Sequence, residues 1–214
     1  MKHVIVIATF LYGALFGVAA AQTLVINSET NYFVQTSNGE PIACGFEFTK
    51  MLQEPAWAGG AVAGITGGIT WSVPANGNIG LFLKIGGADF PDAGTAKGAA
   101  TARPFKIENA FLSKKDSLSL MRPFRRYQCD VVMGSAVEKN QFCGLYYMPE
   151  SADLGSLLLE GALVLSFNRG AGDIDISVPL SGRIEDITHR ETFAQFIGCW
   201  ATLLEGAKQK LGQK

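Results

Sequence analysis

Histidine is almost absent from this chain of 214 residues, which contains only His3 and His189. Histidine is the commonest general base in enzymes, and Ser–His and Cys–His nucleophile systems depend on one. We expect His3 to leave with the N-terminal segment described below, and His189 to have a structural role at the start of a helix. The chain also lacks the G-x-S-x-G, P-loop, G-x-G-x-x-G and H-E-x-x-H motifs. These observations argue against the common hydrolases and nucleotide-binding proteins.

Charged residues are scarce as well. They make up 17% of the chain, against about 25% in an average soluble protein, and the formal net charge is −1. A chain stays disordered when its hydrophobicity is low and its net charge is high, and neither condition holds here. A nucleic-acid binder normally carries a basic excess, which is also missing. We therefore expect a folded protein without a nucleic-acid partner.

An uncharged apolar run stands at the N-terminus, directly after the short basic start Met1-Lys2-His3. It covers residues 4–18 and is followed by three alanines, residues 19–21. A basic start, an apolar stretch and an Ala-x-Ala end are typical of a secretory signal peptide. The alternative is a transmembrane anchor, for which this stretch is barely long enough. We predict that residues 1–21 are cleaved and that residues 22–214 form a single periplasmic or secreted domain with no transmembrane segment.

Cysteine occurs only four times, as Cys44, Cys129, Cys143 and Cys199. An even number in an exported chain favours two disulfides, because an oxidising compartment lets them persist. Cys129 and Cys143 flank a polar stretch and suit a bridge across a hairpin, which leaves Cys44 for Cys199. Other pairings are open, and four free thiols are the alternative. No pair has C-x-x-C spacing, so we expect neither a zinc site nor another cofactor.

Glycine, by contrast, is abundant at 25 residues, and much of the chain alternates between apolar and polar positions. This period of two is typical of strands with one buried face. Strands are expected at residues 23–27, 32–35, 42–51, 79–85, 105–112, 129–136, 141–147, 157–167 and 174–185. The uncharged, glycine-rich residues 57–71 are interpreted as a loop leading into a strand that ends near Val73, with a membrane-inserting hairpin as the alternative.

The C-terminal part of the chain predicts a helix. Thr188 and Glu191 have the spacing of a capping box, and apolar residues follow at steps of three and four. These apolar residues are Phe193, Phe196, Ile197, Trp200, Leu203, Leu204, Ala207 and Leu211. We expect this stripe to pack on a sheet, with Cys199 at its margin.

The predicted fold class is therefore mainly β with a C-terminal α-helix packed on a sheet, as a β-sandwich or an incomplete barrel. A loose echo between residues 44–89 and residues 129–173 suggests two similar β-rich halves, with an internal boundary near residues 113–128. Chance similarity among strands explains the echo equally well.

A basic segment, residues 113–126, is the strongest charge feature of the chain. Its cations are Lys114, Lys115, Arg122, Arg125 and Arg126, against the single acid Asp116. Such a segment is a candidate contact for an anionic partner such as a lipid headgroup, a polysaccharide or an acidic protein surface. The alternative is a solvated connector.

Three functional hypotheses follow. The first is an exported, non-enzymatic binding protein for an apolar ligand or for a surface partner, an unidentified protein or envelope component. The second is a carboxylate-dependent hydrolase of envelope polymers, with Asp89, Asp92, Asp173 and Asp175 as its only candidate acids. The third is a structural subunit of an envelope or surface assembly, which the uncharged residues 57–71 suggest.

Overall fold

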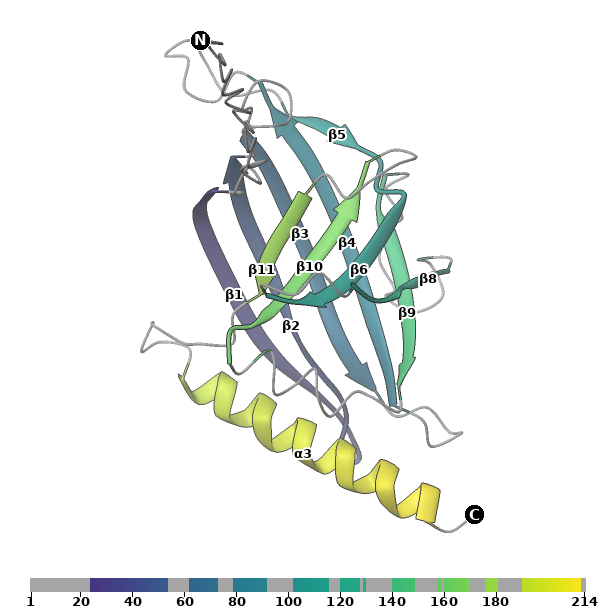
Figure 1. The fold of residues 1–214 in the computed structure, drawn as a ribbon. Coiled ribbons are helices and arrows are strands. Elements are labelled where there is room, and N and C mark those ends of the chain that lie inside the picture. The colour runs from purple at the N-terminus through teal and green to yellow at the C-terminus, as the bar shows by residue number, and fades with distance from the viewer. Residues whose placement is uncertain are drawn as a thin grey trace, which may run out of the picture.

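A computed structural model provides the structure of the protein (Figure 1). It describes residues 24–53, 62–72, 79–91, 102–115, 120–127, 129, 140–148, 158, 160–169, 176–180 and 190–212. The expected signal segment and the capping residue Thr188 lie outside the described residues, as does His189.

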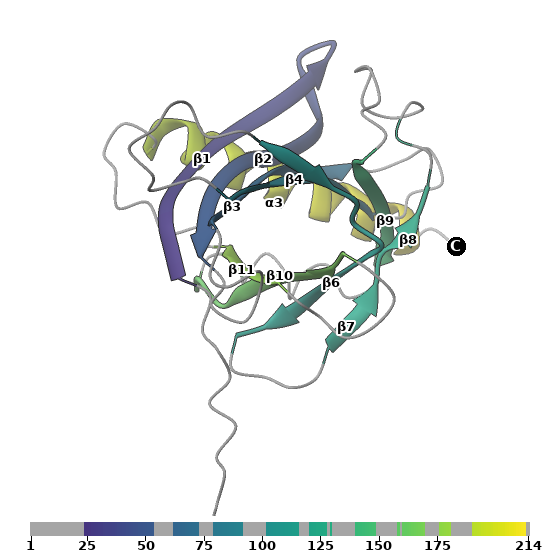
Figure 2. The same cartoon turned by 90° about the horizontal axis from the view of Figure 1, so that it is seen from above.

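In the described residues the β-structure consists of two antiparallel sheets. The large sheet has the order β1 (Leu24–Ser37), β2 (Glu40–Gln53), β3 (Val62–Ser72), β4 (Ile79–Phe90), β9 (Phe142–Met148) and β8 (Arg125–Arg126), and β5 (Arg103–Phe105) pairs with β4 beyond β9. The small sheet has the order β11 (Ile176–Leu180), β10 (Leu163–Asn168), β6 (Asn109–Lys114) and β7 (Leu120–Pro123). The large sheet curves around one side of the core and the small sheet lies on the other (Figure 2). In the described chain the two sheets are not closed into a barrel, so the expected mainly β, sandwich-like fold is confirmed.

A long hairpin opens the large sheet. β1 and β2 have 14 residues each and are joined by Asn38 and Gly39, whose φ angles are 52° and 85°. Two positive φ angles are those of a type I′ turn, for which Asn-Gly is the preferred pair. The two short strands expected at residues 23–27 and 32–35 are therefore parts of one continuous strand.

The strand expected to end near Val73 is present, but it begins already at Val62, so the loop interpretation of residues 57–71 is wrong from that residue onward. These residues form β3, which lies between β2 and β4. The glycines do not interrupt the strand because neighbouring rings use the space they leave: a Cβ at Gly67 would lie 2.9 Å from Cζ of Phe48. β4 likewise continues through Gly86 and Gly87 to Phe90 instead of ending at residue 85, because Gly87 makes room for the Phe105 ring of β5.

The chain changes sheets where a single strand was expected at residues 105–112. β5 ends at Phe105 in the large sheet and β6 begins at Asn109 in the small sheet. β10 begins only at Leu163, since Gly161 has a φ of 68° and its N–H donates to the Leu158 carbonyl in a turn. Of the other expected strands, residues 141–147 correspond to β9 and residues 176–180 to β11, while residues 130–136 lie outside the described part.

The two segments that echo each other in sequence differ in structure. Residues 44–89 contribute β2, β3 and β4, which are neighbours in one sheet, whereas β9 and β10 lie in different sheets. Strands from both sides of residues 113–128 pair in each sheet, and the buried side chains of the described residues form one cluster between the sheets.

The expected C-terminal helix is present as α3 (Arg190–Gly212), which lies across one end of the two sheets (Figure 1). Its residue Phe196 is 2% exposed and contacts the rings of Tyr32, Phe46 and Trp71 at centroid distances of 5.3, 6.5 and 5.7 Å. Phe193 packs on Phe196 at 6.2 Å. We call these five residues the aromatic cluster; it joins α3 to the inner face of the large sheet.

Candidate functional site

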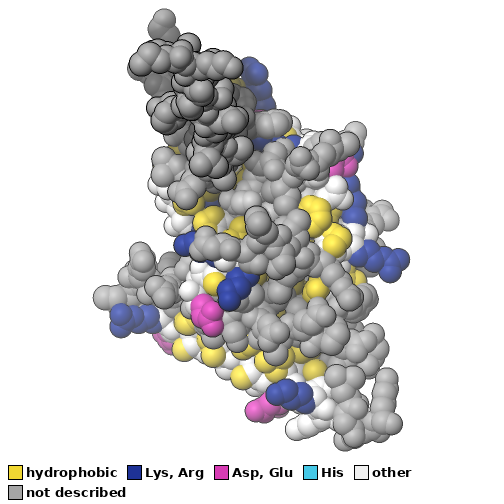
Figure 3. Space-filling model, viewed as in Figure 1, with side chains coloured by type: hydrophobic (Ala, Val, Ile, Leu, Met, Phe, Trp, Pro, Cys, Tyr) yellow, Lys and Arg dark blue, Asp and Glu magenta, His cyan; other side chains and the backbone are white. Residues whose placement is uncertain are grey.

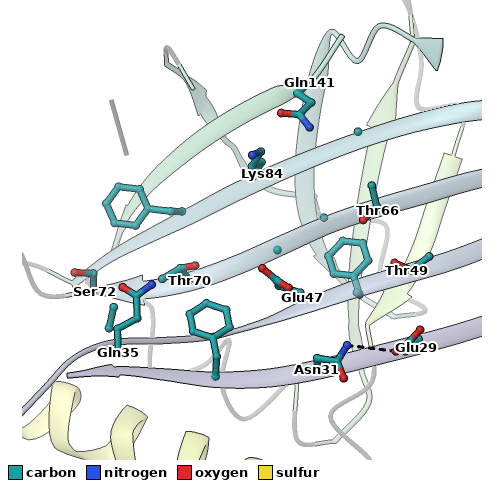
Figure 4. A pocket seen from close by; sticks show the side chains of 17 residues that line it. Glu29, Asn31, Gln35, Glu47, Thr49, Thr66, Thr70, Ser72, Lys84 and Gln141 are labelled. Carbon is teal, nitrogen blue, oxygen red and sulfur yellow. Dashed lines mark hydrogen bonds between the residues drawn. The ribbon is translucent and has the colours of Figure 1, made fainter. Parts of the chain in front are cut away.

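A groove of about 700 Å³ crosses the outer face of the large sheet, from β1 to β4, and reaches Gln141 just before β9 (Figure 4). Side chains alternate between the two faces of a strand. On β2, for example, Phe46 and Phe48 point into the core, whereas Glu47 and Thr49 are exposed on the groove side. The same strands therefore form the core with one face and the groove with the other.

The pairing of the strands arranges the groove residues in transverse rows. One row consists of Asn31 on β1, Glu47 on β2, Gly68 on β3 and Lys84 on β4. Gly68 has no side chain, so a bare stretch of backbone separates Glu47 from Lys84. Two strand spacings place their Cα atoms about 10 Å apart. The row thus places the carboxylate of Glu47 and the ammonium group of Lys84 on opposite sides of an open floor.

Aromatic rings stand at the two ends of the next row, which consists of Phe33, Gly45, Thr70 and Phe82. The Phe33 ring lies over Gly45, where a Cβ would be 2.8 Å from its Cζ. On the other side Phe82 packs edge to face with Tyr127 at a centroid distance of 6.3 Å. The hydroxyl of Thr70 therefore lies between two phenyl rings.

Polar side chains complete the groove on both sides of these rows (Figure 4). The remaining polar lining residues are Glu29, Gln35, Thr49, Thr66, Ser72 and Gln141. The Asn31 amide donates to Glu29 Oε1 at 3.4 Å, and the Ser72 hydroxyl donates to the Ile42 carbonyl at 3.2 Å. The described lining residues offer hydroxyls, amides, two carboxylates and one ammonium group, so they can both donate and accept hydrogen bonds.

Two polar atoms beside the groove are buried without a hydrogen-bond partner among the described residues: Gln141 Oε1 and the Tyr127 hydroxyl oxygen. Burial also raises the pKa of the Tyr127 phenol, so this group stays neutral well above physiological pH. Gln141 covers Gly86, the groove residue of β4 nearest to it, with Cγ 3.4 Å from the position of a Cβ.

None of the four predicted basic residues whose side chains the structure describes lines this groove. Lys114 and Lys115 are exposed at the end of β6 in the small sheet, and Arg125 and Arg126 are exposed on β8 in the large sheet. Arg126 Nη1 lies 3.7 Å from Glu108 Oε2, so Arg126 forms an ion pair with an acidic residue outside the basic segment. The side chain of Arg122 lies outside the described part. On the face shown in Figure 3, basic side chains are scattered and do not form one cluster.

The structure describes one of the four candidate acids of the hydrolase hypothesis. Asp89 Oδ1 accepts a hydrogen bond from Arg169 Nη1 at 3.1 Å, and the Arg169 guanidinium, 3% exposed, also lies 4.8 Å from the Phe105 ring centre. This ion pair connects β4 to the end of β10, so the role of Asp89 in this structure is structural. Asp92, Asp173 and Asp175 lie outside the described residues. Within the described ranges no three His, Cys, Asp or Glu side chains come together as metal ligands.

The cysteines meet in the two predicted pairs. Cys129 and Cys143 form the predicted disulfide, which attaches residue 129 to β9. Cys44 on β2 and Cys199 on α3 also lie together, but both are free, buried thiols, so the second expected disulfide is not formed in this structure.

The sequence contains a signal for the groove that the predicted strand boundaries leave unused. Glu29, Asn31, Phe33 and Gln35 alternate with more buried residues, as they do on a strand with one face in water. The polar run from residue 27 to residue 31 suggested a break between two strands and concealed this pattern. The glycines of β3 had the same effect on Thr66 and Thr70.

No helix in the part of the chain that the structure describes is both long enough and apolar enough to cross a membrane. Comparisons of the chain with models of protein families, with curated proteins and with solved structures find no match in any of the three.

Proposed function

We propose that this protein is an exported, non-enzymatic binding protein that holds an oligosaccharide in the groove on the outer face of the large sheet. One observation carries the proposal: hydroxyl, amide and carboxylate side chains surround an open floor that has phenyl rings at both ends. The hypothesis from the sequence was a surface partner or an apolar ligand. Sites for apolar ligands are concave and mostly apolar, and the lining of this groove favours a polar ligand instead.

The mixture of groups matches the two kinds of surface that a sugar ring presents. Sugar hydroxyls donate and accept hydrogen bonds, as do the hydroxyls of Thr66 and Thr70 and the amides of Asn31 and Gln35. The C–H groups of a sugar ring form an apolar face, which contacts the face of an aromatic ring favourably. Phe33 and Phe82 supply such rings within reach of the polar groups.

The charges of the groove favour a neutral ligand. Among the described lining residues, Glu29 and Glu47 stand against one cation, Lys84, so these residues do not attract a strongly anionic chain. Carboxylates accept hydrogen bonds from hydroxyl groups, and these charge-assisted bonds are stronger than those between neutral groups.

The dimensions favour more than one sugar ring. The lining residues of β1 run from Glu29 to Gln35, about 20 Å along the strand, and the four strands β1 to β4 span about 14 Å across. A single ring would cover only part of this floor, whereas a short chain of rings would contact several rows.

The proposed export agrees with two features of the chain. The N-terminal segment has the three parts of a signal peptide, and the Cys129–Cys143 disulfide is of a kind that persists in oxidising compartments. Polysaccharides of envelopes and matrices are found in those compartments, where such a protein would meet them.

A substitution at the groove floor tests the proposal. A Cβ at Gly68 would make only ordinary contacts, at 3.5 and 3.6 Å, so Gly68→Leu places a side chain in the groove without disturbing the core. Gly198→Leu on α3, where a Cβ meets nothing within 4 Å, is the matched control. A third variant, Phe82→Leu, removes a ring and keeps an apolar side chain.

The purified protein is first screened against arrayed neutral and acidic oligosaccharides, and the best binder is then measured by calorimetry. We expect a neutral oligosaccharide to bind, Gly68→Leu and Phe82→Leu to weaken binding by about tenfold or more, and Gly198→Leu to leave it unchanged. Binding that Gly68→Leu leaves intact would contradict the proposal, as would the absence of any binder. Binding only to acidic chains that is lost in Lys114→Gln/Lys115→Gln would move the site to the basic segment.

A further inference from the structure

Two thiols meet at the contact between α3 and the large sheet. Cys44 lies in the middle of β2, paired with Val34 on β1 and Trp71 on β3, and is 0% exposed. Cys199, on the buried side of α3, is 5% exposed. Both side chains belong to the same cluster of buried residues, and the ring of Phe196, one helical turn before Cys199, lies 5.7 Å from the ring of Trp71, the β3 partner of Cys44.

The surroundings make this contact specific. The aromatic cluster fixes the position of α3 on β1 and β2, beside the thiols. In the folded protein the other two cysteines are bonded to each other, which leaves Cys44 and Cys199 as partners for one another. We propose that Cys44 and Cys199 are a second disulfide site, which covalently links α3 to β2 when the folding chain meets a small oxidised disulfide such as oxidised glutathione.

The reaction is a thiol–disulfide exchange in two steps. Burial raises the pKa of both thiols in the folded protein, so the reaction starts while α3 is undocked and Cys199 can lose its proton to solvent. Its thiolate attacks one sulfur of oxidised glutathione, which breaks that S–S bond and releases one glutathione. Cys44 then loses its proton and attacks the Cys199 sulfur, which releases the second glutathione.

All electrons and protons of this exchange are accounted for. Two electrons pass from the protein thiols to the disulfide of glutathione, which becomes two thiols, and the two protons lost by the protein end on them. The thiolate is the reacting species, and in the folded protein burial disfavours it. We therefore expect the bond to form while α3 is undocked, during folding, and to form slowly once α3 covers the pair.

The site is independent of the proposed groove function, although it lies directly behind the groove. Ala43 lines the groove, and Gly45 lies on the same outer face beneath the Phe33 ring, while Cys44 between them points to the inner face. A disulfide there changes what holds α3 and leaves the lining side chains in place. Oligosaccharide binding should therefore be the same with and without it.

The experiment compares two ways of oxidising the full chain. The protein is reduced and unfolded, then refolded in a mixture of reduced and oxidised glutathione, or refolded reduced and given the same mixture afterwards. Each sample is unfolded in N-ethylmaleimide, weighed by mass spectrometry and digested without reduction. We expect oxidative refolding to give a chain that takes up no maleimide and a peptide that joins Cys44 to Cys199. The chain oxidised after refolding should form this link more slowly.

Cys199→Ala and Cys44→Ser serve as controls, each of which should take up one maleimide and keep the Cys129–Cys143 link. The oxidised protein should unfold at a higher urea concentration than either variant, and this difference should persist when Cys129 and Cys143 are both changed to Ser. Two maleimides at Cys44 and Cys199 after oxidative refolding would overturn the proposal. A link from either residue to Cys129 or Cys143 would do the same. Peptide mapping of the unsubstituted protein decides the question even where a variant fails to fold.

Discussion

Gly67 and Gly68 are consecutive residues of β3 that face opposite sides of the large sheet. A Cβ at Gly67 would lie on the core side, 2.6 Å from the backbone oxygen of Lys84 and 2.9 Å from Cζ of Phe48. A Cβ at Gly68 would lie in the groove, with its nearest neighbours at ordinary distances of 3.5 and 3.6 Å. Neither glycine has a positive φ, so the backbone accepts alanine at both positions. Replacing each by alanine tests the assignment of the two faces.

The expected effects have opposite signs. Gly67→Ala forces a methyl group against a backbone atom that cannot rotate away, and such overpacking costs about 1–3 kcal/mol. Alanine also restricts the unfolded chain, which stabilises the folded state by about 0.4–1 kcal/mol at either position. Gly68→Ala gains this second term alone. We therefore expect Gly67→Ala to lose about 1–2 kcal/mol, Gly68→Ala to gain up to about 1 kcal/mol, and the two to differ by about 2 kcal/mol.

Urea unfolding followed by tryptophan fluorescence measures this difference, because Trp71 is buried in the core and becomes exposed on unfolding. With a slope of about 1–3 kcal/mol per molar urea, the two variants should have midpoints about 1 M apart. Equal shifts in the same direction would refute the reasoning, since they would mean that both glycines face the same kind of surroundings. A stabilised Gly67→Ala would show that the Phe48 ring does not lie over this residue.

Three further substitutions test the core, the ion pair and a buried amine, all by urea unfolding. Phe196→Ala removes the ring at the centre of the aromatic cluster and should lower the free energy of unfolding by about 3–5 kcal/mol, while Gln195→Ala at its exposed neighbour should change it by less than about 0.5 kcal/mol. Asp89→Asn takes away the charge that faces the buried Arg169 guanidinium and should cost about 3 kcal/mol, part of which returns when Arg169→Met is added. Lys50 is 5% exposed, and burial lowers its pKa from 10.5, so Lys50→Met should be more stable than the original protein at neutral pH. This advantage should shrink as the pH rises toward 10.5, because in that window the unfolded chain binds the Lys50 proton more strongly than the folded protein does.

Each of these expectations has an outcome that contradicts it. A loss below about 1 kcal/mol for Phe196→Ala would mean that the ring contacts do not hold α3. An Asp89→Asn variant as stable as the original would assign no stabilising role to the ion pair. For Lys50, a pH-independent difference would show that the amine has the same pKa in both states. Burial raises the pKa of Tyr32 to about 12, but both proteins contain this residue, so its effect cancels in the comparison.

The sequence predicted elements whose burial pattern is local. The stripe of apolar residues around Phe196 predicts α3 because positions three and four apart share one helix face. β9 follows from the alternation in residues 141–147, and the Cys129–Cys143 pair follows from its short separation. In each case the prediction depends only on residues that are close together in the sequence.

The elements that were missed depend on contacts between strands. Nothing within residues 57–71 indicates that Phe48 fills the space beside Gly67, so their glycines resemble a loop. The division of residues 105–112 into β5 and β6 depends on which sheet each part joins. The Asn38-Gly39 turn is an exception, because an Asn-Gly pair between alternating strands predicts a hairpin. That prediction would have required β1 to be recognised as one strand through its polar residues 27–31.

The many glycines and the many phenylalanines of this molecule are related, because phenylalanine rings lie over most of the strand glycines that the structure describes. A phenylalanine ring that lies over a glycine in a sheet compensates for its missing side chain. The covered glycines are Gly45 by Phe33, Gly64 by Phe90, Gly67 by Phe48, Gly80 by Phe82, Gly87 by Phe105 and Gly144 by Phe124. Of the strand glycines in the described residues, only Gly68 and Gly86 have no ring within contact distance, and both line the groove. Because the Gln141 side chain covers Gly86, the open floor of the groove lies at Gly68, which is the reason that Gly68→Leu is the most direct test of what binds there.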